Sequence, residues 1–213
     1  QVRGFSLANV TLVEGESGVI VIDPLQFTEH ARAALALYRQ HRGERAVSAV
    51  IYTHSHRDHY GGVRGVYGDD EARRGVPVIG PAGFTEEAFS ESILAGVPMR
   101  RRAMFQFGWS LAPGPMGHVD SGLGKAVGRG SDGFVAPTLL VTQPVEHHVI
   151  DGVEFVFHLT PGTEAKRSCA NATRSLSCRI NLGRPMTANS SNAAAKPTGP
   201  ATSGVPAWYF AGP

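Results

Sequence analysis

The sequence of 213 residues lacks a long hydrophobic run, has only two cysteines, and has no acidic residue in its last 49 positions. No apolar stretch approaches the roughly 20 residues that cross a bilayer, so no membrane span is predicted. The two cysteines, Cys169 and Cys178, could pair, but they are too few for a disulfide framework and indicate no redox compartment. A hydrophobic content of 42% suffices for the core of one domain.

The distribution of charge divides the chain into two parts. All 18 acidic residues lie in 1–164 with 14 of the 20 basic ones, which gives that part a net charge of −4. The remaining 49 residues hold six basic residues and carry +6. From about Asn189 onward, small and polar residues dominate without apolar periodicity, as in disordered segments. We therefore predict a domain over 1–165 and a divergent, disordered tail over 166–213. The tail has no compact basic block with interleaved aromatics, so nucleic-acid binding is not predicted.

Residues 53–62 read Thr-His-Ser-His-Arg-Asp-His-Tyr-Gly-Gly, and they concentrate potential metal ligands. Three imidazoles and one carboxylate fall within six positions: His54, His56, Asp58 and His59. These ligand types hold zinc when a site must keep a position open for water or substrate. In an extended chain, residues two apart face the same side, so the first three can face one cavity. The glycines at 61 and 62 indicate the turn that the fourth ligand needs.

The pattern of apolar residues predicts a sheet-on-sheet core with flanking helices. A helix is expected over 28–40 with Thr28 as its N-cap, a short one within 61–67, and another over 85–94, capped by Thr85 and ended by Gly96. The glycine- and proline-rich segment 108–137 is expected to be a long loop beside the substrate entrance. Strands are predicted at 2–7, 10–14, 19–22, 46–52, 76–79 and, in a second sheet, at 139–141, 145–150 and 153–159.

His-X-His-X-Asp-His after a strand is the signature of the metallo-β-lactamase superfamily, and the chain resembles its zinc-dependent linear primary alkyl sulfatases. The similarity runs almost continuously from Gln1 to about Ala165. The metal motif identifies the superfamily, whereas Gly-Leu-Gly-Lys at 122–125 and Thr-Pro-Gly-Thr-Glu-Ala at 160–165 point to the sulfatase branch. The resemblance implies an α/β fold, the αββα sandwich, here incomplete.

The resemblance also implies a role for each candidate site residue. His54 and His56 would bind one zinc together with Glu164, and Asp58 and His59 would bind a second. Asp23 would support the metal loop from behind the ligands, although an aspartate that merely ends a strand before proline explains it as well. No His, Asp or Glu follows Glu164, so the second of the family's two zinc sites is incomplete here.

The function that follows is hydrolysis of alkyl sulfate esters such as dodecyl sulfate by a zinc-activated water held by the four-residue cluster. Two alternatives stay open: another hydrolase of the same superfamily, and a non-catalytic remnant that binds one metal at most. Arg64, Arg101 and Arg102 could attract the anionic head group or could be ordinary surface arginines. The resemblance implies a small-molecule partner, a homodimeric parent, and an N-terminus upstream of Gln1. Localisation stays unassigned, with the periplasm or secretion suggested by family analogy alone.

Overall fold

The computed structural model describes residues 1–121, 128–161 and 174–181, and its strands form two sheets. Four strands of the first sheet run parallel, and the edge strand β1 pairs antiparallel with β2. The βαβ connections between these parallel strands place the helices beside the sheet. The order of the first sheet is β1 (Thr11–Glu14), β2 (Val19–Ile22), β3 (Val47–Ile51), β4 (Val78–Pro81) and β5 (Leu139–Val141).

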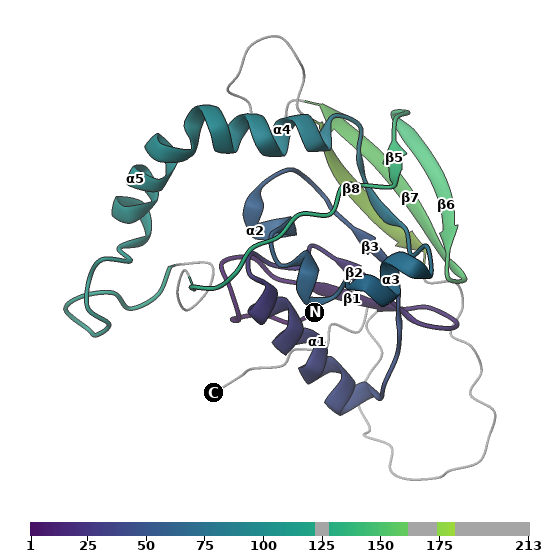
Figure 1. Cartoon of the computed structure of the whole chain (residues 1–213), viewed down its shortest axis with the longest axis horizontal. Helices are drawn as coiled ribbons and strands as arrows, with labels where there is room; N and C mark the ends of the chain where they lie inside the picture. The colour runs from purple at the N-terminus through teal and green to yellow at the C-terminus, as the bar shows by residue number, and fades with distance from the viewer. Residues whose placement is uncertain (122–127, 162–173, 182–213) are drawn as a thin grey trace, which may run out of the picture.

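The second sheet is antiparallel and lies against the first (Figure 1). It consists of β6 (Val145–Ile150), β7 (Val153–Pro161) and β8 (Arg174–Asn181). The turn between β6 and β7 is made by Asp151 and Gly152, whose φ angles are 48° and 77°. Positive φ at both central residues is what a tight two-residue hairpin requires, and an Asp-Gly pair provides it at low cost.

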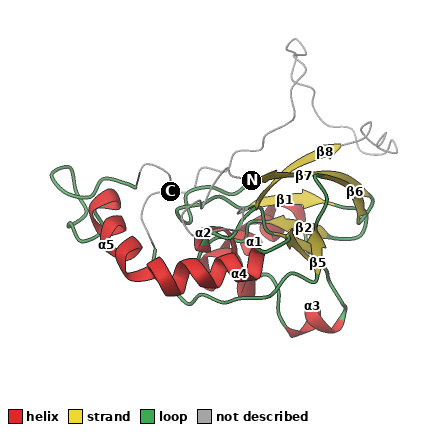
Figure 2. Ribbon diagram, turned by 90° about the horizontal axis from the view of Figure 1, so that it is seen from above, coloured by secondary structure: helices red, strands yellow, loops and turns green. Residues whose placement is uncertain are grey.

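The helical segments follow or connect the strands of the first sheet. None of the described helices combines the length and the hydropathy that crossing a membrane requires. α2 comes directly after the end of β3, while α4, η2 and α5 follow one another and extend away from both sheets (Figures 1 and 2). The segments are α1 (Thr28–Arg42), α2 (Arg57–Tyr60), η1 (Val63–Gly65), α3 (Asp69–Arg73), α4 (Phe84–Ser90), η2 (Glu91–Ala95) and α5 (Gly96–Phe107).

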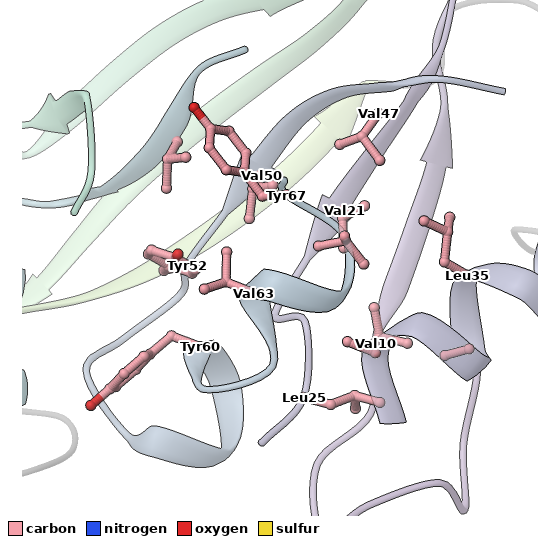
Figure 3. Packing of buried hydrophobic residues seen from close by; sticks show 14 of the residues in the cluster. Val10, Val21, Leu25, Leu35, Val47, Val50, Tyr52, Tyr60, Val63 and Tyr67 are labelled. Carbon is pink, nitrogen blue, oxygen red and sulfur yellow. The ribbon is translucent and has the colours of Figure 1, made fainter. Parts of the chain in front are cut away.

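The alternation of side chains along β2 explains why the first sheet is covered on both faces. Val19 and Val21 belong to a core with the helices, which includes Leu35 of α1 and Val63 of η1 (Figure 3). Ile20 and Ile22, on the opposite face, join a second core with buried residues of the second sheet, among them Phe155 and Phe157. A strand of four consecutive apolar residues, all buried, is the pattern of a parallel strand inside a layered α/β fold. Helices, first sheet and second sheet therefore form three layers.

Several predicted elements need correction. Residues 139–141 form a strand as predicted, but β5 extends the first sheet beside β4 rather than the second. Of the strand predicted over 2–7, only an isolated bridge between Val2 and Val10 is present. The helix predicted to end before Gly96 continues through η2 and α5 to Phe107. α1 begins at Thr28 with Phe27 as its N-cap, so Thr28 is not the capping residue.

The predicted disordered tail also needs a partial correction. Residues 174–181 of that range form β8, which pairs with β7 from Glu154 to Pro161 and so extends the second sheet past the predicted domain boundary at 165. The segment alternates apolar and polar residues at Leu176, Cys178 and Ile180, a strand signal that the small and polar neighbours obscured. The other parts of the predicted tail, 166–173 and 182–213, lie outside the described residues.

Candidate metal centre

The candidate centre lies where two neighbouring parallel strands end. Ile22 of β2 and Ile51 of β3 are register partners, and the backbone N–H of Asp23 donates to the carbonyl of Ile51 at 3.0 Å. The chain after β3 leads into Thr53 and the histidine cluster, and α2 follows at once (Figure 1). The carboxyl ends of parallel strands are where α/β sheets place ligand sites, because the loops there converge from adjacent strands.

The four predicted ligands come together as two pairs. Nε2 of His54 lies 3.1 Å from Nδ1 of His56, and their ring centroids are 4.6 Å apart. Nε2 of His59 lies 3.5 Å from Oδ2 of Asp58, the neighbouring residue in the first turn of α2. The rings of His54 and His59 are themselves only 4.1 Å apart between centroids, so the two pairs are adjacent. His54 is buried, whereas the side chains of Asp58 and His59 are partly open to solvent.

Asp23 and Thr53 hold the histidine rings from behind. Oδ2 of Asp23 lies 2.9 Å from Nδ1 of His59, and Oγ1 of Thr53 lies 2.9 Å from Nδ1 of His54. Because each Nδ1 is engaged in this way, Nε2 is the nitrogen that each ring directs toward its paired donor. Buried Asp23 also accepts the backbone N–H of Thr53 at 2.8 Å and its hydroxyl at 2.7 Å. One carboxylate thus connects both rings, directly to His59 and through Thr53 to His54.

A sharp reversal after β2 directs the Asp23 carboxylate toward β3. Asp23 and Leu25 both adopt positive φ, 54° and 63°, and the N–H of Leu25 donates to the carbonyl of Asp23 at 2.7 Å. Aspartate tolerates this conformation better than most residues, but for a bulky side chain such as that of Leu25 it is unusual. Leu25 is completely buried, so packing in the core stabilises the strained turn.

Two glycines let the segment after the ligands approach this reversal closely. A Cβ added to Gly61 would lie 2.4 Å from the carbonyl oxygen of Gln26, and one added to Gly62 would lie 2.2 Å from that of Pro24. Both obstacles are backbone atoms, which cannot rotate away as a side chain can. The glycine pair was predicted as a turn, and in the structure its more important property is the space it leaves for the neighbouring loop.

Residues 131–135 of the predicted long loop lie against α2 and the start of α1. The N–H of Gly133 donates to the carbonyl of Gly61 at 2.7 Å, and Asp132 forms an ion pair with Arg57, the first residue of α2. The buried hydroxyl of Tyr52 donates to the carbonyl of Val135 at 3.1 Å, and burial raises the pKa of that hydroxyl. The loop therefore fixes both ends of the ligand segment, and a substrate entrance beside it stays a prediction.

The remaining predicted residues have different positions. Glu164 lies outside the described residues, so its place relative to the histidines is not described. Arg64 is in η1, close enough to the loop for its guanidinium to donate to the carbonyl of Phe134 at 3.4 Å. Arg101 and Arg102 are exposed on α5, the helix farthest from the sheets in Figure 1. Across the three described ranges, no set of three or more His, Cys, Asp or Glu side chains is arranged to hold one ion.

Thr53 was not predicted as a site residue, although it directly precedes the motif. Its hydroxyl is a donor to Asp23 and a partner of His54, so it orients a ring that the motif alone does not fix. Arg57 and Asp132 were missed as well, because 75 residues separate them in the sequence. Only the position of Thr53 at the end of a buried strand could have indicated its role.

Comparison with characterised proteins extends the similarity beyond the motif. The chain is 49% identical over 166 residues to "Alkyl/aryl-sulfatase BDS1" of Saccharomyces cerevisiae, an alignment that covers 78% of this chain and 26% of the yeast protein. It is 48% identical over 167 residues to an "(R)-specific secondary-alkylsulfatase" of Pseudomonas sp, covering 78% and 25% of the two chains. The chain thus spans about a quarter of the length of these relatives.

A solved structure agrees with both the fold and the resemblance. The "stereoselective inverting sec-alkylsulfatase Pisa1" from Pseudomonas sp. superposes with a TM-score of 0.76 at 44% sequence identity, over 84% of this chain and 28% of that one. The predicted resemblance to alkyl sulfatases and the predicted sandwich fold are therefore confirmed. The family described as "Metallo-beta-lactamase superfamily" matches residues 3–163, which is most of the described chain. The chain belongs to the metallo-beta-lactamase superfamily.

Proposed function

We propose that the chain is the metal-binding core of a zinc-dependent hydrolase that cleaves alkyl sulfate esters into an alcohol and sulfate. The observation that carries the proposal is the pairing of donor atoms at the end of β3, His54 with His56 and Asp58 with His59. The sulfate-ester substrate is inferred from relatives that are 45–49% identical and are described as alkylsulfatases. Superfamily membership supports a metal-dependent reaction, and zinc is the metal that we propose.

The separations within the pairs fit zinc. With bonds of about 2.0–2.1 Å and tetrahedral angles, two donors to one zinc ion lie roughly 3.4 Å apart. The nitrogens of His54 and His56 are 3.1 Å apart, and the donors of His59 and Asp58 are 3.5 Å apart. Imidazole and carboxylate are also the donor types of catalytic zinc sites. Each pair therefore supplies half of a tetrahedral set, and Glu164 is proposed as the next donor beside the two histidines.

The other side chains of the centre prepare the donors. Asp23 and Thr53 fix the orientation of the His59 and His54 rings through their Nδ1 atoms, which leaves each Nε2 lone pair for the metal. Zinc held there supplies a Lewis acid that makes a water molecule nucleophilic near neutral pH. The partly exposed side of the Asp58–His59 pair is the side from which a small sulfate ester can approach. The partners that we propose are this small molecule and a second copy of the chain.

A second candidate function is metal binding without catalysis. It is favoured by the two donors per pair and by the lack of any His, Asp or Glu after Glu164 in this sequence, where the resemblance implies further ligands for the Asp58–His59 pair. The two candidates differ in activity but share the metal centre. They are therefore separated by measuring zinc content and sulfate release on the same protein.

The test combines a zinc titration with an assay of sulfate release from dodecyl sulfate. We expect bound zinc and hydrolysis in the wild-type chain, and neither in His54→Ala/His56→Ala. His147→Ala is the matched control, because the side chain of His147 is 66% exposed on β6, away from the candidate centre. Zinc uptake without sulfate release would assign the non-catalytic function. Equal zinc uptake by the double variant and the wild type would refute the metal centre itself.

A further inference from the structure

The crossing segment, defined here as residues 131–135, is attached at both of its ends to the core of the protein. At one end, the carbonyl of Ser131 accepts the N–H of Thr28 at 2.8 Å, and the N–H of Ser131 donates to the carboxylate of Glu29 at 2.9 Å. At the other end, the carbonyl of Val135 accepts the hydroxyl of Tyr52, a buried residue directly after β3. The segment is therefore fixed to the start of α1 and to the end of β3.

Two polar contacts join the middle of the crossing segment to the two ends of α2. The carboxylate of Asp132 forms an ion pair with the guanidinium of Arg57, the first residue of α2. The N–H of Gly133 donates at 2.7 Å to the carbonyl of Gly61, the C-cap of the same helix. Consecutive residues of the segment thus hold the beginning and the end of one helical turn.

The next residue of the crossing segment, Phe134, adds an apolar contact to α2. Its ring meets the ring of Tyr60 edge to face, with 5.7 Å between the centroids. It also stacks on Phe84 at a centroid distance of 6.4 Å, and Phe84 in turn contacts Tyr60 at 5.5 Å. Tyr60 is buried and directly follows His59, so this aromatic cluster fixes the chain beside a predicted ligand.

α2 depends on contacts of this kind because it is too short to be stable alone. It has four residues, and no side chain of the described ranges caps its N-terminal end at His56. Forming one isolated helical turn is unfavourable, because several backbone dihedrals are fixed for a single hydrogen bond. The turn nevertheless carries both donors of the second pair, Asp58 and His59, which lie 3.5 Å apart. The place of that pair is therefore set by whatever holds α2.

We propose that Arg57 and Asp132 are positioning residues for the second zinc: their ion pair anchors α2 to the crossing segment and so keeps the Asp58–His59 pair in place. The inference rests on the proposed zinc centre and deepens it. The His54–His56 pair depends on this anchor less, because both residues precede α2 and the ring of His54 is held by Thr53. The side chains of Arg57 and Asp132 are 50% and 34% exposed, so water screens their attraction and limits its effect on an equilibrium to about 5-fold.

Zinc titration of the full chain against a competing chelator measures the two binding steps separately. Arg57→Gln and Asp132→Asn should each weaken the second step by about 3–5-fold and leave the first within about 2-fold. The double variant should be no weaker than either single variant, because all three lose the same interaction. Arg57→Lys keeps the charge and should retain most of the wild-type affinity.

Arg42→Gln is the matched control for this titration. It removes the same charge and breaks the ion pair of Arg42 with Glu14, whose side chains are 54% and 32% exposed, close to the values of the Arg57–Asp132 pair. Arg42 is the last residue of α1 and has no printed contact with α2 or with the crossing segment. Both zinc steps should therefore be those of the wild type.

Amide hydrogen exchange on the zinc-free protein tests the anchoring by itself. The N–H groups of Gly61 and Gly133, which bond to the carbonyls of Arg57 and Gly61, should exchange about 3–5-fold faster in Arg57→Gln and Asp132→Asn, and at the wild-type rate in the control.

Several outcomes would overturn the proposal. They are unchanged exchange in both variants, a single zinc step in the wild type, equal weakening of the two steps, and effects of the single variants that add in the double variant. Additive effects would show that Arg57 acts independently of Asp132, for example by contacting the sulfate ester directly. A wild type that takes up no zinc but shows the exchange difference would refute the proposed function and support the anchoring of α2.

Discussion

The ligand segment, residues 53–62, and the helical arm, residues 84–107 with α4, η2 and α5, both follow strands of the first sheet, but their side chains have different surroundings. In the ligand segment, the buried carboxylate of Asp23 holds the ring of His59, and the hydroxyl of Thr53 holds that of His54. In the arm, Glu86, Glu87, Arg101 and Arg102 form no ion pair within the described ranges, and large apolar side chains face solvent. The side chains of the first region are fixed by contacts within the chain, whereas those of the second are largely exposed.

The difference predicts where substitutions matter. Contacts within the ligand segment exist in the monomer, so their loss should reduce stability or metal affinity at any protein concentration. Exposed side chains of the distal arm have few contacts within the described chain, so their replacement should change the free energy of unfolding little. Matched substitutions in the two regions should therefore differ in their effects on unfolding and on metal binding.

The largest expected contrast is between two phenylalanines of the arm. Phe84, at its root, is 1% exposed and stacks on Tyr52 at a centroid distance of 4.8 Å, close to the ligand segment. Phe84→Ala should lower the free energy of unfolding by about 3–5 kcal/mol, because it leaves a cavity. Phe105→Ala, at an 89% exposed position, should change it by less than about 0.5 kcal/mol. Urea unfolding of both variants gives the comparison, and equal losses would show that the distal arm is packed in the monomer.

The next contrast uses one substitution, glycine to alanine, in both regions. Gly62→Ala should destabilise by about 1–3 kcal/mol, because its Cβ would meet the carbonyl oxygens of Pro24 and Phe27 at 2.2 and 2.7 Å. Gly96→Ala should stabilise by about 0.5–1 kcal/mol, since nothing lies within 4 Å of its Cβ and helical backbone suits alanine better. Thermal unfolding should move the two midpoints in opposite directions. A decrease for both would contradict the open surroundings of Gly96.

The sequence could predict the first region well because local signals and tertiary contacts agree there. The apolar run of β2, the strand before the ligands and the glycine turn are each local features, and all are present in the structure. The pairing of Asp23 with Thr53 was beyond reach, because it depends on β2 and β3 being neighbours. Likewise, α1 begins at Thr28 without a side-chain cap, and Thr28 instead donates its N–H to the carbonyl of Ser131 at 2.8 Å, a contact across the long loop.

The second region could not be predicted from the same rules. Gly96 and Pro98 indicate the end of a helix, yet both lie in the first turn of α5, where backbone N–H groups have no helical acceptor and proline is tolerated. The strand at 139–141 was assigned to the wrong sheet, because a three-residue strand carries no signal for its neighbour. Composition and periodicity predict whether a segment is a helix or a strand. They do not predict which distant segment it packs against.

A smaller effect is expected from the carboxylate that joins the two strand ends. Asp23→Asn keeps the size of the side chain and suits the φ of 54°, but its NH₂ group cannot accept a hydrogen bond as a carboxylate oxygen does. Removing such support of a metal ligand typically lowers metal affinity by about 10–100-fold. Competition titration with a zinc-binding dye measures this loss, and Asp69→Asn, on exposed α3, should leave the affinity unchanged. Unchanged affinity in Asp23→Asn would mean that Asp23 only ends β2.

The smallest effect concerns Glu146, a fully engaged carboxylate of the second sheet, and it depends on pH. The backbone N–H of Gln143, the side chain of His148 and the backbone and hydroxyl of Thr142 lower the pKa of Glu146 to about 2. Because its folded pKa lies below the usual value of 4.5, its stabilising contribution is present above pH 4.5 and is lost as the pH falls toward 2. Glu146→Gln should therefore lower the urea midpoint at pH 7, with a difference from wild type that shrinks below pH 4.5. Glu86→Gln, at an exposed and unpaired position of the arm, is the matched change and should shift the midpoint little at either pH. A difference for Glu146→Gln that stays constant from pH 7 to pH 3 would show that its contacts do not depend on the charge.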